Sequence, residues 1–322
     1  KKSAARLPVP NTSPRLRLWA ALFIIVVLAP PVSCSYVPQT HDSRVLRLKG
    51  GRDVRHNMAA ASPVVVPAKS SHSATVIWLH GLGDSGSGWA PIAQQLSLPH
   101  VKWIFPNAGS RPVTINGGTA MPAWADIIAL SLEAPEDEEG TLATKNLIHS
   151  LIADEVKAGV PANRIVIGGF SQGAAMSCVA ALTHDQPLAG CFILSGYLTL
   201  RNKIPNLLTD AGRATPFFQA HGSQDMVVPF MFGQISSQLI SSFGVKVDFH
   251  NYVMGHASCE QELADLKTFF SKVIPAAAPA PIPSDLNALS AKELKEILKA
   301  RSVDFSDCYE KCDLVNKVQQ LV

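Results

Sequence analysis

The sequence is poor in cysteine and in charge. Its six cysteines among 322 residues are too few and too scattered for a disulfide framework, and none has the spacing of a zinc ribbon. Charged residues make up only 16% of the chain, whereas hydrophobic residues make up 47% and the mean hydropathy is +0.16. Disordered chains lack this apolar content, so an enzyme-sized globular domain with a buried core is expected.

Basic residues are unevenly distributed along the chain. Residues 1–71 hold eleven Lys or Arg and two acids, whereas residues 72–275 hold eleven basic and sixteen acidic side chains. Residues 276–322 hold six basic and seven acidic side chains, and the whole chain has a net charge of +3. The acidic balance outside the N-terminal part argues against nucleic acid as a partner.

A short apolar run near the N-terminus predicts a targeting segment. The run from Leu18 to Ala29 follows five basic residues and precedes Pro30 and Pro31, and a cleavage site is expected after Cys34. Its twelve residues fall short of the roughly 20 that a membrane span needs. A signal peptide therefore fits the run better, and a single-pass anchor is the alternative.

The rest of the N-terminal part leaves two interpretations open. Residues 35–71 are rich in Arg and poor in acids, as organelle transit peptides are, so a signal plus transit peptide for the secretory route or a plastid is expected. The alternative interpretation is that residues 1–57 come from an incomplete or mispredicted gene start, because the first Met of the chain is Met58. In that case the expected location is the cytoplasm.

From Ala74 onward, short β-branched or aromatic runs alternate with amphipathic segments of helical length. This alternation predicts an α/β fold with a mainly parallel sheet flanked by helices. The expected strands cover residues 75–79, 101–105, 164–168, 190–194, 215–220 and 245–252. The expected helices cover residues 141–158, 172–183, 231–242 and 260–273.

Two smaller segments follow the α/β region. Residues 276–284 belong to an uncharged stretch rich in Pro and Ala, which predicts a stiff linker. Ser290 and Glu293 form a capping-box pattern that opens a helix, and a second helix is expected to follow. The expected organisation is an N-terminal extension over residues 1–71, an α/β domain over 72–275, the linker over 276–284 and a helical module over 285–322.

The strongest chemical signal is a G-x-S-x-G pattern at residues 169–173, between an apolar strand and an apolar helix. A strand that turns sharply into a helix holds the central serine in a strained conformation, and the flanking glycines avoid clashes. Ser171 is therefore the predicted nucleophile, with a buried serine in a glycine-rich turn as the alternative. The amide of Gln172, at the helix start, is expected to face any oxyanion that forms.

A serine hydroxyl needs a base, and the base needs an acceptor that orients it. Asp225 is the predicted acceptor because it lies in a loop just beyond the carboxyl end of an expected strand, where α/β sheets assemble their sites. Asp210 precedes that strand and Asp248 lies within another, so both are expected to be solvated surface acids.

The predicted base is His256, in a loop between the last strand and the last helix of the domain. The chain order of serine, acid and histidine favours it. His221 is the serious competitor because it begins the Asp225 loop, and we interpret it as a hydrogen-bonding or packing residue of that turn. The second oxyanion donor is expected in the turn His80-Gly81-Leu82-Gly83 after an early strand, with the Leu82 amide as the candidate.

The segments HGLGD, RPVTIN, AMPAWADII, GGFSQGAA, HGSQD and GHASC occur in this order. Together they resemble the acyl-protein thioesterases, the phospholipase/carboxylesterase branch of the α/β hydrolases, over residues 72–275. The resemblance implies a catalytic triad of Ser171, Asp225 and His256 with no metal and no cofactor. It also implies hydrolysis of thioesters that link fatty acyl groups to protein cysteines, of lysophospholipids and of small esters.

The same resemblance implies an apolar acyl channel beside a flexible segment. A simple packed loop explains the apolar residues of this segment equally well. Tyr197 stands where animal members commonly have Trp, and GGTAMP replaces a bulkier stretch. Both departures bear on chain-length preference rather than on catalysis. The residues that correspond to the channel are Met121, Trp124, Ile127, Ile128 and Leu130.

The C-terminal module resembles a SAP-like helix-loop-helix, of the type that ends certain neurotrophic-factor-like proteins. Many SAP modules bind DNA, but this segment is slightly acidic, so we expect protein contact or a stabilising role. Cys308 and Cys312 share a helical face without a nearby His, which favours ordinary helix residues over a metal site.

The first functional hypothesis is a serine hydrolase acting on S-acylated proteins or lysolipids, with transient contact to a membrane surface. Within the enzyme class the alternative is a lysophospholipase or a broad carboxylesterase. From a different class, the alternative is a binding protein on a hydrolase fold that works through residues 285–322.

Overall fold

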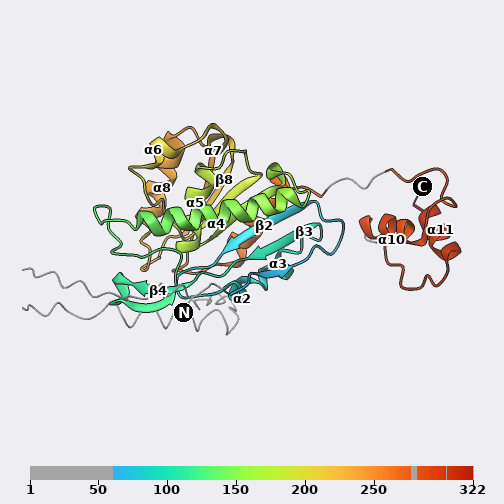
Figure 1. Ribbon diagram of the computed structural model, residues 1–322, viewed down its shortest axis with the longest axis horizontal. Helices are drawn as coiled ribbons and strands as arrows, with labels where there is room; N and C mark the ends of the chain where they lie inside the picture. The colour runs from blue at the N-terminus through green and yellow to red at the C-terminus, as the bar shows by residue number, and fades with distance from the viewer. Residues whose placement is uncertain (1–60, 277–280, 302, 322) are drawn as a thin grey trace, which may run out of the picture. The chain divides into compact units, whose positions relative to one another are not determined.

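The computed structural model describes residues 61–276, 281–301 and 303–321 (Figure 1). The predicted signal peptide, and the transit segment up to residue 60, lie outside the described residues. Within the described ranges, no helix is both long and apolar enough to cross a membrane.

The α/β region is built on a seven-stranded sheet. In sheet order its strands are β1 (Val64–Val66), β3 (Val101–Phe105), β2 (Ala74–Leu79), β6 (Ile165–Phe170), β7 (Gly190–Leu194), β8 (Phe217–Gly222) and β9 (Val247–Tyr252). All neighbouring pairs are parallel except β1 with β3. Strands β2, β7 and β8 are buried along their whole length because helices cover both faces of the sheet, which explains their largely apolar sequences.

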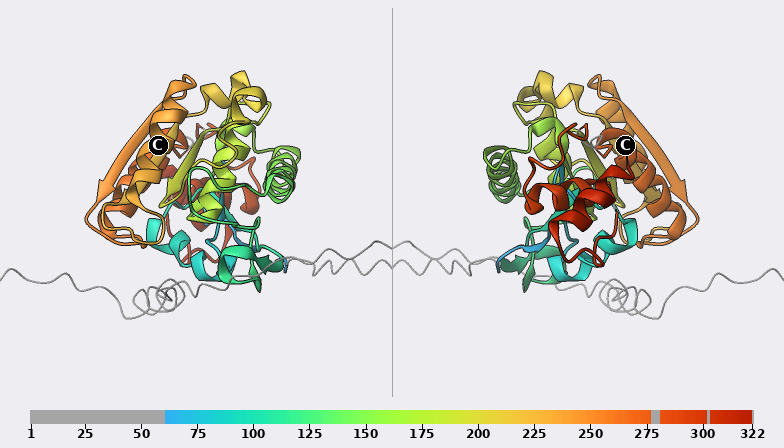
Figure 2. Two further views of the ribbon diagram at one scale, coloured as in Figure 1. Left: turned by 90° about the vertical axis from the view of Figure 1, so that its left-hand side faces the viewer. Right: turned by 90° about the vertical axis from the view of Figure 1, so that its right-hand side faces the viewer.

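Helices lie on both faces of the sheet (Figure 2). Beneath them, each face has its own apolar core. One face is covered by α4 (Glu138–Lys157), α5 (Gln172–Leu182) and α8 (Phe230–Ser242), and the other by α3 (Ile92–Leu96) and α9 (Glu260–Val273). Short helices α2 (Gly86–Trp89), α6 (Ile204–Leu207) and α7 (Asp210–Ala214) lie in the connections. Because the parallel strands share one direction, the loops after β2, β6, β8 and β9 meet at one edge of the sheet.

All six predicted strands and all four predicted helices are present, with bounds within three residues of the expected ones. The sequence patterns missed β1 and the hairpin of β4 (Ser110–Val113) and β5 (Thr119–Pro122). Strand β1 has three residues between two prolines, which is too short for a periodic pattern. Its pairing with β3 extends the sheet upstream of residue 72, where the α/β domain was expected to begin.

The C-terminal module consists of α10 (Ala291–Ala300) and α11 (Lys311–Gln319). The predicted capping box is present, because the Ser290 side chain accepts from the Glu293 backbone and the Glu293 carboxylate accepts from the Ser290 N–H at 2.7 Å. The buried residues of its apolar core are Leu286, Leu294, Leu298, Leu314, Val315 and Val318.

Candidate active site

Ser171 lies at the sharp turn between β6 and α5, with φ of 53° and ψ of −120°. A non-glycine residue is strained at such a positive φ. The sharp turn that requires this conformation places the Ser171 side chain outside the sheet. The turn is held by the Ser171 N–H, which donates to the Leu194 carbonyl of β7 at 2.8 Å. A side chain at Gly169 or Gly173 would place its Cβ only 2.2 or 2.4 Å from the Leu79 carbonyl oxygen. Only glycine therefore lets the end of β2 press against this turn.

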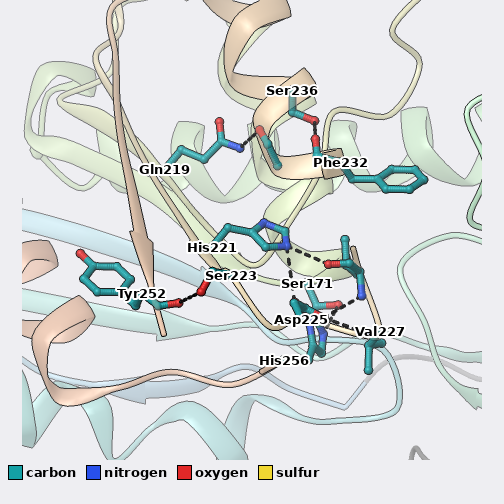
Figure 3. A network of polar contacts seen from close by, with 12 residues as sticks. Ser171, Gln219, His221, Ser223, Asp225, Val227, Phe232, Ser236, Tyr252 and His256 are labelled. Carbon is teal, nitrogen blue, oxygen red and sulfur yellow. Dashed lines mark hydrogen bonds and ion pairs between the residues drawn. The ribbon is translucent and has the colours of Figure 1, made fainter. Parts of the chain in front are cut away.

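His256 lies between Ser171 and Asp225 in one line of hydrogen bonds (Figure 3). Its Nε2 is 3.0 Å from the Ser171 Oγ, and its Nδ1 is 2.7 Å from the Asp225 Oδ2. The Asp225 carboxylate only accepts, so the imidazole hydrogen belongs on Nδ1 and Nε2 is left to accept from the serine hydroxyl. The three residues come from the loops after β6, β8 and β9, so the fold joins groups that are far apart in sequence.

Asp225 is buried, yet its surroundings favour the ionised form. Burial opposes ionisation, but hydrogen bonds from His221, His256 and the Val228 backbone outweigh it, so the pKa of Asp225 is lowered. Its Oδ1 accepts from the backbone N–H groups of Val227 and Val228, both at 2.9 Å. The carboxylate is thus held in one orientation beside the imidazole.

The alternative candidates for the base and the acid are His221, Asp210 and Asp248, and none of them hydrogen-bonds to Ser171. His221 is fully buried; its Nε2 is 2.8 Å from the Val228 carbonyl oxygen and 3.4 Å from the Asp225 Oδ2, in keeping with the expected hydrogen-bonding role in this turn. The Asp210 side chain is fully exposed, and the Asp248 side chain is exposed and pairs with His250. Both carboxylates are surface acids, as expected.

The turn that carries Leu82 and the start of α5 at Gln172 both lie next to Ser171. The turn that contains Leu82 lies against Ser171, since a Cβ on Gly81 would be 3.5 Å from the Ser171 Cβ. Among the described residues, neither the Leu82 N–H nor the Gln172 N–H has a hydrogen-bond partner. Gln172 is also the first residue of α5, where the helix dipole favours negative charge. Two free donors therefore remain for an oxygen near Ser171.

The five residues assigned to the acyl channel separate into two groups. Ile127, Ile128 and Leu130 line a cavity together with Gln172, the predicted oxyanion residue. Trp124 does not line it: its side chain is buried and its Nε1 donates to the His80 carbonyl at 2.8 Å.

Met121 also lies outside the cavity lining. Its Sδ is 3.3 Å from the Asn116 Nδ2 and would be 3.9 Å from a Cβ on Gly83. Met121 therefore lies beside the turn that carries Leu82. Among the described residues, no group of three or more His, Cys, Asp or Glu is arranged to hold a metal ion.

Sequence patterns did not assign a role to the His80 side chain, although its backbone was placed in the oxyanion turn. His80 is fully buried, and its Nδ1 is 2.7 Å from the Gly81 carbonyl oxygen while its Nε2 is 3.1 Å from the Ala108 nitrogen. The signal that the sequence offers is its position directly before the turn Gly81-Leu82-Gly83. Its contact with Ala108 is long-range and leaves no local pattern.

Known proteins are similar to this chain in sequence and in fold. Acyl-protein thioesterase 1 of Neurospora crassa is 42% identical over an alignment that covers 69% of this chain and 96% of the relative. Acyl-protein thioesterase 2 of Zea mays is similar in structure, with a TM-score of 0.61, 31% identity, and coverage of 66% of this chain and 98% of the other. SOBER1 of Arabidopsis thaliana has a TM-score of 0.61 at 30% identity, covering 63% of this chain and 99% of the other.

Two family models match the chain in different regions. The C-terminal residues 283–322 match the E3 ubiquitin-protein ligase rififylin-like domain, and the SAP-like resemblance stays an expectation. Residues 60–274 match the phospholipase/carboxylesterase model, which includes every residue of the Ser171, Asp225 and His256 line. The chain therefore belongs to the phospholipase/carboxylesterase family of α/β hydrolases.

Proposed function

We propose that this chain is a serine hydrolase that cleaves the acyl thioesters of S-acylated proteins, and related carboxylic esters, through an acyl-enzyme intermediate. The observation that carries the proposal is the hydrogen-bonded line from Ser171 through His256 to Asp225. Relatives named acyl-protein thioesterase support the thioester as the bond that is cleaved. Ser171 is the nucleophile, His256 the general base and Asp225 the acceptor that orients the imidazole.

The reaction proceeds in two halves. The Ser171 Oγ attacks the thioester carbonyl carbon while its proton passes to His256 Nε2, which gives a tetrahedral oxyanion. When the C–S bond breaks, His256 returns the proton to the leaving thiolate, and the acyl group stays on Ser171. Water then attacks the acyl-enzyme with His256 as base, and the carboxylic acid and the free serine are released. None of these steps requires a metal or a cofactor.

The oxyanion is stabilised by the backbone N–H groups of Leu82 and Gln172. Donors that are free in the resting enzyme and fixed in place need no reorganisation when charge develops on the carbonyl oxygen. Loss of one such donor typically slows turnover by about 10²- to 10³-fold. The first turn of α5 adds a favourable dipole at Gln172.

The acyl chain of the substrate is proposed to follow the cavity wall made by Ile127, Ile128 and Leu130. The cavity also reaches Gln172, the residue next to Ser171, which supports this path for the acyl chain. Trp124 donates a hydrogen bond to the His80 carbonyl, and Met121 lies beside Gly83. Both residues therefore contact the turn that carries Leu82, and we do not assign them to the acyl chain.

The proposal is tested by steady-state kinetics of the purified chain on a palmitoyl-thioester peptide, a lysophospholipid and short carboxylic esters. The expected result is the highest kcat/KM on the thioester peptide, with activity lost in Ser171→Ala. A preference for the lysolipid would assign the phospholipase activity that the family description also names. Turnover of all substrates by Ser171→Ala would contradict the proposed nucleophile.

A further inference from the structure

We propose that His80 is a positioning residue that orients the Gly81–Leu82 peptide so that the Leu82 N–H faces the carbonyl oxygen of the substrate. The inference rests on the proposed function and adds to it a residue whose side chain hydrogen-bonds to Gly81 and Ala108 rather than to the triad. His80 follows the last residue of β2, at the edge of the sheet where Ser171 lies. Its imidazole is completely buried, so its two nitrogens depend on the protein for their hydrogen bonds.

The partners of His80 select one tautomer. The Ala108 backbone N–H can only donate, and it lies 3.1 Å from Nε2, so Nε2 must accept and carries no hydrogen. The hydrogen is therefore on Nδ1, where it is donated to the Gly81 carbonyl oxygen at 2.7 Å. Burial lowers the pKa of His80, which agrees with a neutral ring.

The geometry of the peptide bond converts this contact into an orientation of the oxyanion donor. In a trans peptide the C=O of one residue and the N–H of the next point in opposite directions. Once the Gly81 C=O is held by the imidazole, the Leu82 N–H must point away from it. The Asp84 N–H also donates to the Gly81 carbonyl, at 3.2 Å, so His80 is the shorter of two contacts that hold this peptide.

A second set of contacts links His80 to the other oxyanion donor. The Trp124 Nε1 donates to the His80 carbonyl at 2.8 Å, and the centroids of the two rings are 4.8 Å apart. The Trp124 N–H donates to the Gln172 Oε1 at 2.9 Å, and the Gln172 Nε2 donates to the Ala125 carbonyl at 2.6 Å. One buried network therefore connects the residues that carry both free amides.

The two nitrogens of His80 can be replaced separately. In His80→Asn the side-chain amide NH₂ takes the place of Nδ1–H and keeps a donor for the Gly81 carbonyl. In His80→Gln the longer side chain offers an acceptor near Nε2 for Ala108 and loses the donor to Gly81. His80→Leu removes both, and circular dichroism and thermal unfolding report whether each variant is folded.

The experiment measures kcat and KM on a carboxylic ester and the rate of Ser171 labelling by a fluorophosphonate, whose phosphoryl oxygen also needs the oxyanion donors. We expect His80→Gln and His80→Leu to lose about 10- to 100-fold in kcat and in labelling rate. This loss is smaller than that for complete removal of an oxyanion donor, because the Leu82 N–H is still present but is less well oriented. KM should change less than about twofold, because the oxyanion contact forms mainly in the transition state. His80→Asn should stay within about fivefold of the wild-type rate.

The outcomes separate this inference from the proposed function. A wild-type chain that is labelled at Ser171, with His80→Gln labelled as fast, would overturn the positioning role alone. Equal losses in the Asn and Gln variants would also overturn it, because they would show that only the packing of the imidazole matters. A wild-type chain that is not labelled at Ser171 would overturn both proposals.

Discussion

Glu262, in the first turn of α9, is buried with no hydrogen-bond partner for either side-chain oxygen among the described residues. Burial disfavours the charged carboxylate and raises the pKa of Glu262 from 4.5 to about 8. The backbone of Cys259 acts in the opposite direction but does not offset the burial. Glu262 is therefore mostly protonated at pH 7 and becomes charged inside the fold above pH 8.

This shift makes the stability of the fold depend on pH in a defined direction. The folded state binds the Glu262 proton more tightly than the unfolded state, so the contribution of Glu262 to stability is fully present below pH 4.5 and is lost as the pH rises through about 8. A rise from 4.5 to about 8 corresponds to about 5 kcal/mol in the free energy of unfolding, at 1.36 kcal/mol per pH unit. Most of this, about 4 kcal/mol, is lost between pH 5 and pH 9.

The assay is urea unfolding of the wild type and of Glu262→Gln, an uncharged side chain of the same shape, at pH 5 and pH 9. We expect the variant to gain about 4 kcal/mol relative to the wild type on going from pH 5 to pH 9. Glu260→Gln, an exposed residue of the same turn, is the matched control and should show no such gain. If the free energies of unfolding of Glu262→Gln and wild type differ by the same amount at both pH values, the pKa of Glu262 is not raised in the folded state.

Three further predictions concern the site and the module. Asp225→Asn should fold normally but lose about 10⁴-fold in kcat, because the imidazole loses its orienting carboxylate; unchanged turnover would point to another acid. Gly173→Ala should lower the free energy of unfolding by about 3 kcal/mol or more, because the new Cβ would lie 2.4 Å from the Leu79 carbonyl oxygen; a wild-type Tm would contradict the close approach. Deleting residues 276–322 should leave kcat/KM within about twofold, because the module has its own core and the proposed triad lies between residues 171 and 256; a large loss of activity would contradict this independence.

Local sequence patterns predict the parts of this protein that have local causes. The strands at 165–170 and 190–194 are apolar runs between helices, so their place in a parallel sheet can be read from composition and length. The serine turn needs glycines at fixed positions, which makes Ser171 recognisable from five residues. The order of acid and histidine after it follows from where parallel strands end.

The parts that could not be predicted depend on contacts between distant residues. Strand β1 is only three residues long and is defined by its pairing with β3, about 40 residues further along the chain. Trp124 looks like an acyl-channel residue by its apolar character, but its indole N–H bonds to His80 across the site. The tautomer of His80 likewise depends on Ala108, which no spacing rule connects to it.

The central claim is that Ser171 carries the acyl group during turnover, and acid-quenched mass spectrometry tests it most directly. The chain is mixed with a palmitoyl-thioester peptide, quenched during turnover, digested and mapped. We expect an acyl adduct on the peptide that contains Ser171, and neither adduct nor turnover in Ser171→Ala. An adduct on a different residue, or continued thioester cleavage by Ser171→Ala, would contradict it.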